Sequence, residues 1–325
     1  FEKLFNTIYY GGSYYDGLKI SDPGEYDCDL LLVLPSYAKP VVTTETNYPG
    51  FVKIFLSDLE KFRKQPEYPK YYTDLPKLLE DDYLCGNKLK KWMESLLDKV
   101  FNDLKTEKNY CSFDVDDNKY YFKKTKGGPA FTMHVTDSLD NDKFFLDMDL
   151  VPCFQFGEGE WPRDNGFRQN TTDISSFFVV PKAPKNCQGY DKSGRYWRLS
   201  FQQQEQKIIG KRQSLKPAIK LLKKLRDNEK HVSISSYFIK TIFLWKVDEG
   251  DEKFWTANLS NVFMKMLKQY QQHLKEGQIP YFWNKEFNLI TDINPKELEN
   301  ICNRITKIVN NIDRDPQLVQ NYLGR

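Results

Sequence analysis

The sequence has few histidines and no paired cysteines. Three histidines and six cysteines are spread over 325 residues, with no CxxC pair and no cluster of cysteine with histidine. Scattered thiols of this kind are typical of reduced cysteines in a cytosolic or nuclear protein. We therefore expect a cytoplasmic protein without a structural zinc site.

Long apolar runs and a large net charge are also missing. The longest apolar runs, such as LLLVL at 30–34, are far shorter than a membrane span, and no signal peptide is visible. We therefore expect no association with a membrane. The net charge is only +3, so binding to a polyanion would depend on local clusters. The chain begins with Phe1 and not with methionine, which indicates a fragment of a longer protein.

The first half of the chain carries strand patterns around one long helix. Hydrophobic residues make up 40% of the chain and aromatic residues 15%, which is enough to bury a sizeable core. FEKLF at the start indicates the end of a helix, which the following Gly-Gly would stop. Helical spacing predicts a helix over 86–107. The patterns predict strands at 26–34, 48–56, 119–125, 131–137 and 143–154.

The second half is predominantly helical in pattern. A loop rich in Pro, Gly and Lys occupies 181–194. Beyond it, apolar spacing predicts helices at about 201–212, 216–228, 234–246, 256–275 and 295–311. We therefore predict an α+β fold of two lobes, with a mixed sheet and helices in 1–185 and a helical lobe in 186–325.

Alternating acids precede the apolar run at 30–34. Glu25, Asp27 and Asp29 point to one face of the predicted strand, because side chains alternate along a strand. Such a row is typical of an exposed face on an edge strand. A second strand, however, carries Asp147 and Asp149 in the same acid-x-acid pattern among apolar neighbours. Both interpretations stay open on these residues alone.

The acid pattern also suits metal-dependent phosphate chemistry. Carboxylates from two neighbouring strands can hold two Mg²⁺ ions, which prefer oxygen ligands and take the rest from water and phosphates. Two such ions would promote attack of a hydroxyl group and departure of pyrophosphate. The Gly-Gly-Ser turn at 11–13 offers backbone N–H groups and a hydroxyl near a phosphate. This layout is typical of polymerase-β-like nucleotidyltransferases.

One long string makes a closer resemblance visible. GGSYYDGLKISDPGEYDCDLLLVLP at 11–35 resembles the activation-loop and metal-site segment of cyclic GMP-AMP synthase (cGAS) and the cGAS-like receptors of animals. GGPAF, MDLVPCF followed by WP, FFVVPKAPK followed by YWRLSF, and SSYFIKTIFLW match further segments in the family's order. The resemblance therefore covers nearly the whole chain.

The resemblance implies a set of site residues in a two-lobed polymerase-β-like core. Glu25, Asp27 and Asp149 would be the catalytic ligands of two Mg²⁺ or Mn²⁺ ions, whereas Asp29 and Asp147 fall outside the family's triad. The implied nucleotide-binding residues are Gly12 and Ser13 at the phosphates, Arg198 and Ser200 facing the nucleotides, Lys220 near the triphosphate, and Ser236 and Tyr237 closing the pocket. A core aromatic ring at 237, a solvated lysine at 220 and a surface ion pair at 198 are the alternatives.

The chain departs from the vertebrate enzyme in one segment. That enzyme carries a His/Cys zinc module where this chain has only QQQEQKIIGKRQS at 202–214, which contains neither residue type. The loop associated with gripping double-stranded DNA is missing with it. The chain therefore looks most like the zinc-less insect members that respond to double-stranded RNA.

A local basic cluster fits such an activator. Residues 205–230 contain nine Lys or Arg and three Asp or Glu, which leaves +6. Lysines four residues apart lie along one face of a helix and suit a phosphate backbone, although a solvated helix face is the alternative. The predicted RNA-binding residues are Lys207, Lys211, Arg212 and Lys216.

The function implied is an RNA-activated enzyme of innate immunity. ATP and GTP would be joined into a cyclic dinucleotide second messenger, with double-stranded RNA as activator and a possible dimer on the nucleic acid. Two other functions remain open: a catalytically silent scaffold of the same fold, and a nucleotidyltransferase that acts on an RNA end.

Overall fold

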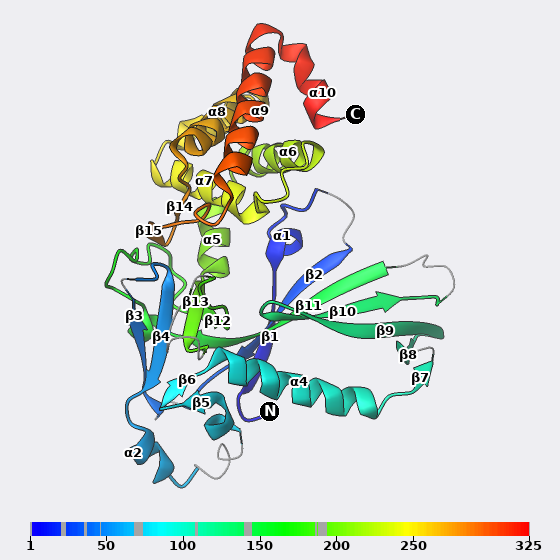
Figure 1. The fold of residues 1–325 in the computed structure, drawn as a ribbon, viewed down its shortest axis with the longest axis vertical. Helices are drawn as coiled ribbons and strands as arrows, with labels where there is room; N and C mark the ends of the chain where they lie inside the picture. The colour runs from blue at the N-terminus through cyan, green and yellow to red at the C-terminus, as the bar shows by residue number, and fades with distance from the viewer. Residues whose placement is uncertain are drawn as a thin grey trace. The chain divides into compact units, whose positions relative to one another are not determined.

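The computed structural model describes residues 2–20, 24–35, 38–45, 47–67, 74–107, 110–139, 145–185, 187 and 194–324. The chain forms two compact units, coloured by residue number in Figure 1. Unit 1 comprises Phe1–Tyr15, Asp22–Asn165 and Asp173–Gln202, and unit 2 comprises Asp16–Ser21, Gly166–Thr172 and Gln203–Arg325. The boundary predicted between 185 and 186 stays a prediction.

Unit 1 is built on one large mixed sheet. Its strands are β1 (Phe5–Gly11), β2 (Glu25–Leu32), β3 (Pro40–Thr44), β4 (Phe51–Leu56), β5 (Leu79–Glu80), β6 (Tyr83–Leu84), β7 (Thr106–Glu107), β8 (Tyr110–Val115), β9 (Asn118–Gly127), β10 (Ala130–Thr136), β11 (Phe145–Phe156), β12 (Phe177–Val180) and β13 (Tyr196–Ser200). The main path runs β5-β6-β4-β13-β12-β11-β10-β9-β8-β7. The predicted strands are confirmed, because each coincides with one of β2, β4, β9, β10 and β11.

The start of the chain differs from its prediction. FEKLF was expected to end a helix, but β1 begins at Phe5 and pairs antiparallel with β2. The helix prediction is therefore wrong here. Pairing to an apolar neighbouring strand overrides the local helix propensity of a few residues. The turn that ends β1 leads directly into α1 (Gly12–Tyr15).

The two faces of the sheet have different roles. Leu30 of β2 and Phe131 of β10 pack with Met93 of α4 (Gly86–Asn102). The helix predicted over 86–107 is thus confirmed up to Asn102, whereas residues 106–107 form β7. On the other face, Leu31 and Cys153 pack with Phe178 of β12. Because side chains alternate, the odd-numbered acids of β2 lie on the face of Leu31. The remaining helices of unit 1 are α2 (Leu59–Arg63), η2 (Leu75–Leu78) and η3 (Glu158–Glu160).

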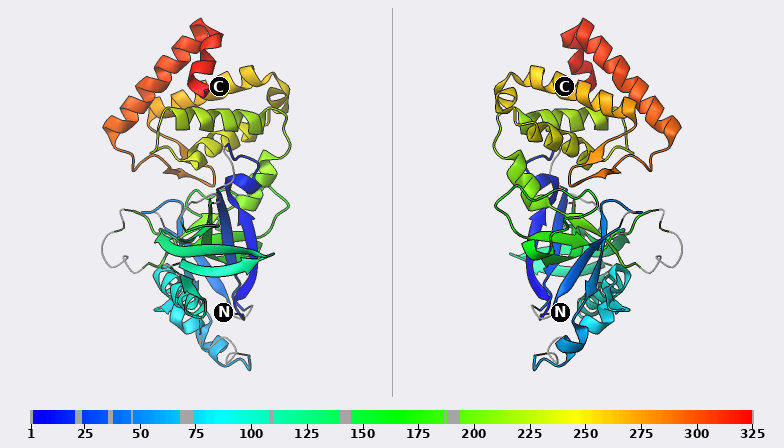
Figure 2. Two further views of the ribbon diagram at one scale, coloured as in Figure 1. Left: turned by 90° about the vertical axis from the view of Figure 1, so that its right-hand side faces the viewer. Right: turned by 90° about the vertical axis from the view of Figure 1, so that its left-hand side faces the viewer.

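Unit 2 is a helical assembly with its own core. Its elements are α5 (Gln202–Ile209), which starts at the last residue of unit 1, α6 (Leu215–Asn228), α7 (Ser236–Asp248), η5 (Glu252–Thr256), α8 (Leu259–Glu276), β14 (Pro280–Tyr281), β15 (Asn284–Asn288), α9 (Pro295–Arg314), η6 (Pro316–Leu318) and α10 (Val319–Leu323). Helix α6 packs on α7 and α8, and α8 packs on α9 (Figure 2). The five predicted helices are confirmed, although the one predicted over 201–212 already ends at Ile209.

These elements confirm the predicted α+β class. Apolar periodicity was sufficient for helices that bury one face, as α6 does with Leu222 and α8 does with Met266. Helix α7 is instead buried on all sides over 239–244. Within the described residues, no helix is both long and apolar enough to cross a membrane.

Candidate active site

The acids of β2 and β11 are brought together by parallel pairing of these strands. Asp27 lies opposite Asp149, and Glu25 lies opposite Asp147. Neighbouring strands are about 4.8 Å apart, so the carboxylates of such a pair can reach one ion. Glu25 is exposed, whereas Asp27 and Asp149 are half-buried. The sheet thus presents a row of acids where β2 begins, near the turn between β1 and α1.

Side chains of β10 hold the acids of β11 in place. The hydroxyl of Thr132 donates to Asp149 Oδ1 at 2.5 Å. His134 Nδ1 lies 2.5 Å from Asp147 Oδ1, and its Nε2 lies 2.8 Å from the hydroxyl of Thr125. Asp147 and Asp149 are therefore both held by side chains of β10. Neither Thr132 nor His134 was predicted as a site residue, because the sequence does not reveal which residues of β10 lie opposite the acids of β11.

The turn between β1 and α1 closes on Asp27. Gly12 has φ +76°, and a Cβ built there would lie 1.7 Å from Asp27 Oδ2. Only glycine combines this left-handed backbone with so close an approach. Ser13 follows in α1 and is half-buried. The turn predicted to approach a phosphate therefore touches a predicted metal ligand.

Asp29 continues the acidic row into the core. Its side chain is only 4% exposed. Burial raises the pKa of Asp29 to about 7, although hydrogen bonds from Cys153 and Gln202 work in the opposite direction. Gln202 Nε2 donates to Asp29 Oδ2 at 2.9 Å. Glu25 and Asp27 are more accessible to solvent, so the three alternating acids differ in environment although they share one face.

The donor set suits a hard divalent cation. Carboxylate oxygens are the ligands that Mg²⁺ and Mn²⁺ prefer, and Mg²⁺ is commonly held by one or two carboxylates completed by water and substrate phosphates. Asp27 and Asp149 supply such a pair, with Glu25 on the same face. Across the described residues, no group of three His, Cys, Asp or Glu side chains is arranged to hold an ion by itself. The three-ligand assignment stays a prediction.

Two other predicted residues of unit 1 lie on β13. Arg198 pairs with Val180 of β12 on one side and with Phe51 of β4 on the other, and its side chain is half-buried. The hydroxyl of Ser200 accepts a hydrogen bond from Gln202 Nε2 at 3.2 Å. Ser200 is therefore linked through one glutamine to Asp29.

Within unit 2, Tyr237 is oriented by a buried acid. Its hydroxyl donates to Glu205 Oε1 at 2.7 Å, and Trp283 Nε1 donates to the same oxygen at 3.0 Å. Ser235 caps α7 by accepting from the Tyr237 N–H, which places Ser236 in the first turn. The Tyr237 ring is half-buried, so it is neither a fully buried core residue nor a free one.

The same acid belongs to a buried ion network that the sequence did not reveal. Lys240 Nζ lies 2.7 Å from Asp16 Oδ2 and 2.9 Å from Glu205 Oε2. All three side chains are buried. Burial alone would lower the pKa of Lys240, but Glu205 and Asp16 raise it above its ordinary value, so Lys240 is charged. The network ties the segment after α1 to α5 and α7.

Lysines of α6 fall into two environments. Lys216 and Lys220 are half-buried, and Lys216 lies close to Gly17. Lys223 is 5% exposed and donates to the carbonyl oxygen of Leu18 at 2.7 Å. Burial, followed by the nearby Arg226 guanidinium, lowers the pKa of Lys223 to about 8. The lysine one turn beyond the predicted triphosphate ligand is thus a structural residue.

The prediction that Lys207 and Lys211 lie along one face of the same helix is wrong. Helix α5 ends at Ile209, so Lys211 lies in the turn beyond it, although Lys211 is exposed. Gly210, at φ +55°, stops the helix. Arg212 donates to the carboxylate of Glu252 and to the carbonyl groups that end α5. Its charge is therefore compensated by Glu252, whereas a residue that contacts phosphate is expected to be open to solvent.

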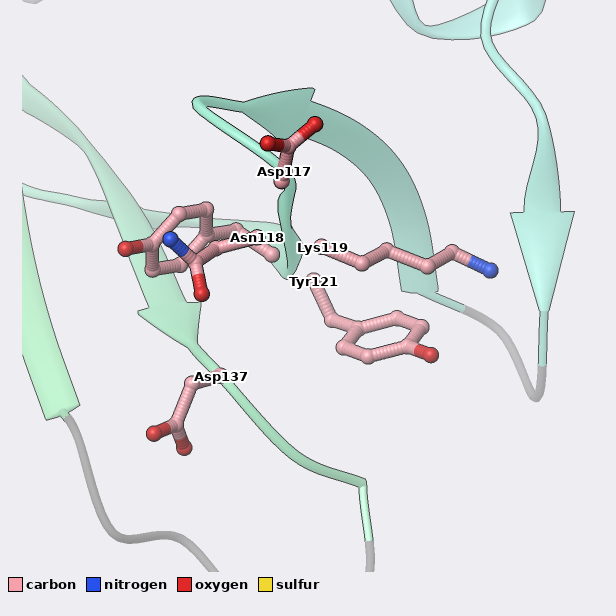
Figure 3. A pocket seen from close by; sticks show the side chains of 6 residues that line it. Asp117, Asn118, Lys119, Tyr121 and Asp137 are labelled. Carbon is pink, nitrogen blue, oxygen red and sulfur yellow. The ribbon is translucent and has the colours of Figure 1, made fainter.

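A surface pocket lies elsewhere in unit 1. Figure 3 shows it at the tip of the β8–β9 hairpin. It is lined by Asp117, Asn118, Lys119, Tyr120, Tyr121 and Asp137. None of these residues was predicted to bind a ligand, and Lys119 is paired with Glu107. The acidic face of β2 and β11 is the better candidate for an active site, because its carboxylates converge across neighbouring strands.

Two family models match the chain. Residues 14–211 match the Mab-21 protein nucleotidyltransferase domain, which includes the β2 and β11 acids. Residues 214–307 match the Mab-21 protein HhH/H2TH-like domain. The two matches follow the order of the sheet-bearing and helical parts of the chain.

Several curated insect proteins are similar over nearly the whole chain. A cyclic GMP-AMP synthase-like receptor of Tribolium castaneum is 40% identical over 328 residues, covering 99% of this chain and 80% of that protein. A receptor of the same name from Aethina tumida is 39% identical, with the same coverage. One from Trichogramma pretiosum is 34% identical, covering 97% of this chain and 64% of that protein.

Proposed function

Because the chain belongs to the Mab-21 nucleotidyltransferase family and, within it, to the cGAS-like receptors of insects, we propose that it makes a cyclic dinucleotide from ATP and GTP. The pairing of Asp27 with Asp149 beside the glycine-serine turn carries this proposal. A phosphate-binding turn in contact with a metal-binding carboxylate is what transfer of a nucleotidyl group requires.

The proposed reaction is the displacement of pyrophosphate by a ribose hydroxyl. The hydroxyl oxygen of one nucleotide attacks the α-phosphorus of the other, the new P–O bond forms, and the bond to pyrophosphate breaks. The proton of the hydroxyl passes to water or to a nearby carboxylate. A second displacement of the same kind closes the ring. When bound, two Mg²⁺ or Mn²⁺ ions would favour loss of that proton and stabilise the charge on pyrophosphate.

The residues of the chain would divide this work. Glu25, Asp27 and Asp149 would hold the ions, and Thr132 would fix one carboxylate through its hydrogen bond. Gly12 would allow the triphosphate to approach the carboxylates closely.

Binding of the nucleotides would involve six further residues. Ser13 and Lys220 would contact phosphates, Arg198 and Ser200 would face the nucleotides, and Ser236 and Tyr237 would close the nucleotide pocket. The half-buried Tyr237 ring, fixed by Glu205, supports a stacking role on a base.

Double-stranded RNA is the proposed activator. Lys207, Lys211 and Lys216 offer side chains that are exposed or half-buried in unit 2. A-form RNA presents phosphates and 2′-hydroxyl groups that such lysines can contact without reading sequence. Arg212 belongs to the proposed surface only if RNA displaces Glu252. The product would act as a cytoplasmic second messenger in antiviral defence, and RNA could bring two copies together.

One experiment tests the proposal. The protein is incubated with labelled ATP and GTP, Mg²⁺ or Mn²⁺, and either double-stranded RNA or double-stranded DNA, and the products are resolved. A nuclease-resistant cyclic product that appears only with RNA supports the proposal. Label on the RNA identifies an RNA-end transferase, and no product under any condition identifies a silent scaffold. An Asp27→Asn, Asp149→Asn variant is the control, because it keeps the shape of both side chains without their charge.

A further inference from the structure

Asp29 is a buried acid without a place in the proposed chemistry. It lies on the same face as Glu25 and Asp27 but is 4% exposed, next to the core residue Cys153. A buried carboxyl group is costly unless it is hydrogen-bonded. Its position therefore calls for a partner that uses it, and the side chain of Gln202 supplies one.

Gln202 connects Asp29 with two residues proposed to bind a nucleotide. Its Nε2 group donates to Asp29 at 2.9 Å and to the Ser200 hydroxyl at 3.2 Å. Its Oε1 atom accepts from the Gly12 N–H at 3.4 Å. A Cβ built on Gly11 would lie 2.1 Å from the same oxygen, so the backbone of the turn rests directly on the amide.

The carboxyl group decides which way the amide of Gln202 faces. An amide has two donors at nitrogen and two acceptor sites at oxygen. With nitrogen toward the carboxyl oxygen of Asp29, the oxygen faces the Gly12 N–H. The opposite orientation would place two N–H groups against each other at Gly12 and two oxygens against each other at Asp29. An acceptor at position 29 thereby fixes the hydrogen bond at the turn.

We propose that Asp29 and Gln202 are a positioning pair for the glycine-serine turn. The pair holds Gly12 against Asp27, where a triphosphate would meet a proposed metal ligand. It also occupies an acceptor site of the Ser200 hydroxyl, which leaves that hydroxyl's hydrogen for an acceptor on the nucleotide. Neither residue touches the reacting atoms. The inference rests on the proposed function, because it assigns the turn to nucleotide binding.

The test compares three single variants and one double variant, which combines Gln202→Met with Asp29→Leu. These two substitutions remove the hydrogen bonds with little change of volume, whereas Asp29→Asn keeps an acceptor oxygen. We expect kcat/KM for the triphosphates to fall about 10- to 100-fold in Gln202→Met and in Asp29→Leu, as for other residues that orient ligands. Asp29→Asn is expected to stay within about threefold of wild type, and the double variant to be no worse than Gln202→Met.

A binding measurement separates this inference from the proposed function. The Kd of α,β-methylene-ATP is measured with Mg²⁺, without turnover, and is expected to rise about 10-fold in Gln202→Met and Asp29→Leu. If wild type binds this analogue but forms no product, the proposed function fails while the positioning pair is still tested. Leu31→Val, in the same buried cluster but without a hydrogen bond to Asp29, is the control and is expected to keep Kd within about twofold.

Three results would overturn the positioning pair. The first is an unchanged Kd in Gln202→Met. The second is an equal loss in Asp29→Asn and Asp29→Leu, because both remove the carboxylate but only Asp29→Asn keeps an acceptor oxygen, so the acceptor would then not account for the loss. The third is a double variant whose loss is the sum of the single losses, since a relay that acts as a unit is not additive.

Discussion

Replacing Lys240 by methionine is expected to destabilise unit 2 strongly. The ammonium group of Lys240 lies within 2.9 Å of two buried carboxylates, those of Asp16 and Glu205. Methionine fills a similar volume but leaves both acids without their cation. Removing one partner of a buried ion pair costs about 3–5 kcal/mol, because the remaining charge is neither solvated nor compensated. That is a large part of the roughly 5–15 kcal/mol that stabilises a typical domain.

Urea unfolding followed by tryptophan fluorescence measures this loss. Trp283 is a built-in reporter, because its indole N–H donates to Glu205. Lys246→Met is the matched control on the same helix. Its partner Glu249 is half exposed, and such a surface pair contributes only about 0.3–0.5 kcal/mol.

Neutralising the stranded acids is the decisive comparison. Adding Asp16→Asn and Glu205→Gln to Lys240→Met removes the buried charges, while the amide oxygen introduced at position 205 can still accept from Trp283 and Tyr237. We expect at least about half of the lost free energy of unfolding to return. A loss in Lys240→Met no greater than in the surface control, or no recovery in the triple variant, would refute the assignment of this network as a buried charge cluster.

The remaining predictions concern the turn, a buried lysine and a strand contact. Gly12→Ala should lower turnover by at least about 100-fold with an unchanged circular dichroism spectrum, because its Cβ would collide with Asp27; near-wild-type turnover would contradict the proposed turn. In wild type, the free energy of unfolding should rise with pH between about pH 8 and 10, because the pKa of Lys223 is lowered to about 8 in the folded state and the unfolded chain then binds more protons. Lys223→Met should remove this rise. Urea midpoints that change in parallel for wild type and variant over this range would contradict the prediction. Thr132→Val should weaken Mn²⁺ binding about 10-fold, measured by electron paramagnetic resonance, because Asp149 loses its hydrogen bond; unchanged affinity would exclude a role in orienting the ligand.

Local pattern was sufficient to predict most elements of the fold. The strands that became β2 and β11 and the helices α6 to α9 follow from alternation and from helical spacing, which depend on near neighbours in the chain. The helix predicted at FEKLF is the exception. Five residues carry too little periodicity to outweigh pairing of β1 with β2. The acid-x-acid pattern likewise predicts that Asp27 and Asp149 lie on strands, because it depends only on near neighbours in the chain.

The tertiary structure alone decided which of these residues meet. Asp27 and Asp149 are far apart in the chain, and only the parallel register of their strands sets them side by side. Gln202 reaches Asp29 across 173 residues, and Lys240 reaches Asp16 across 224. No periodicity encodes such contacts. They depend on the packing of distant segments, in which a buried polar group must find a partner wherever the fold provides one.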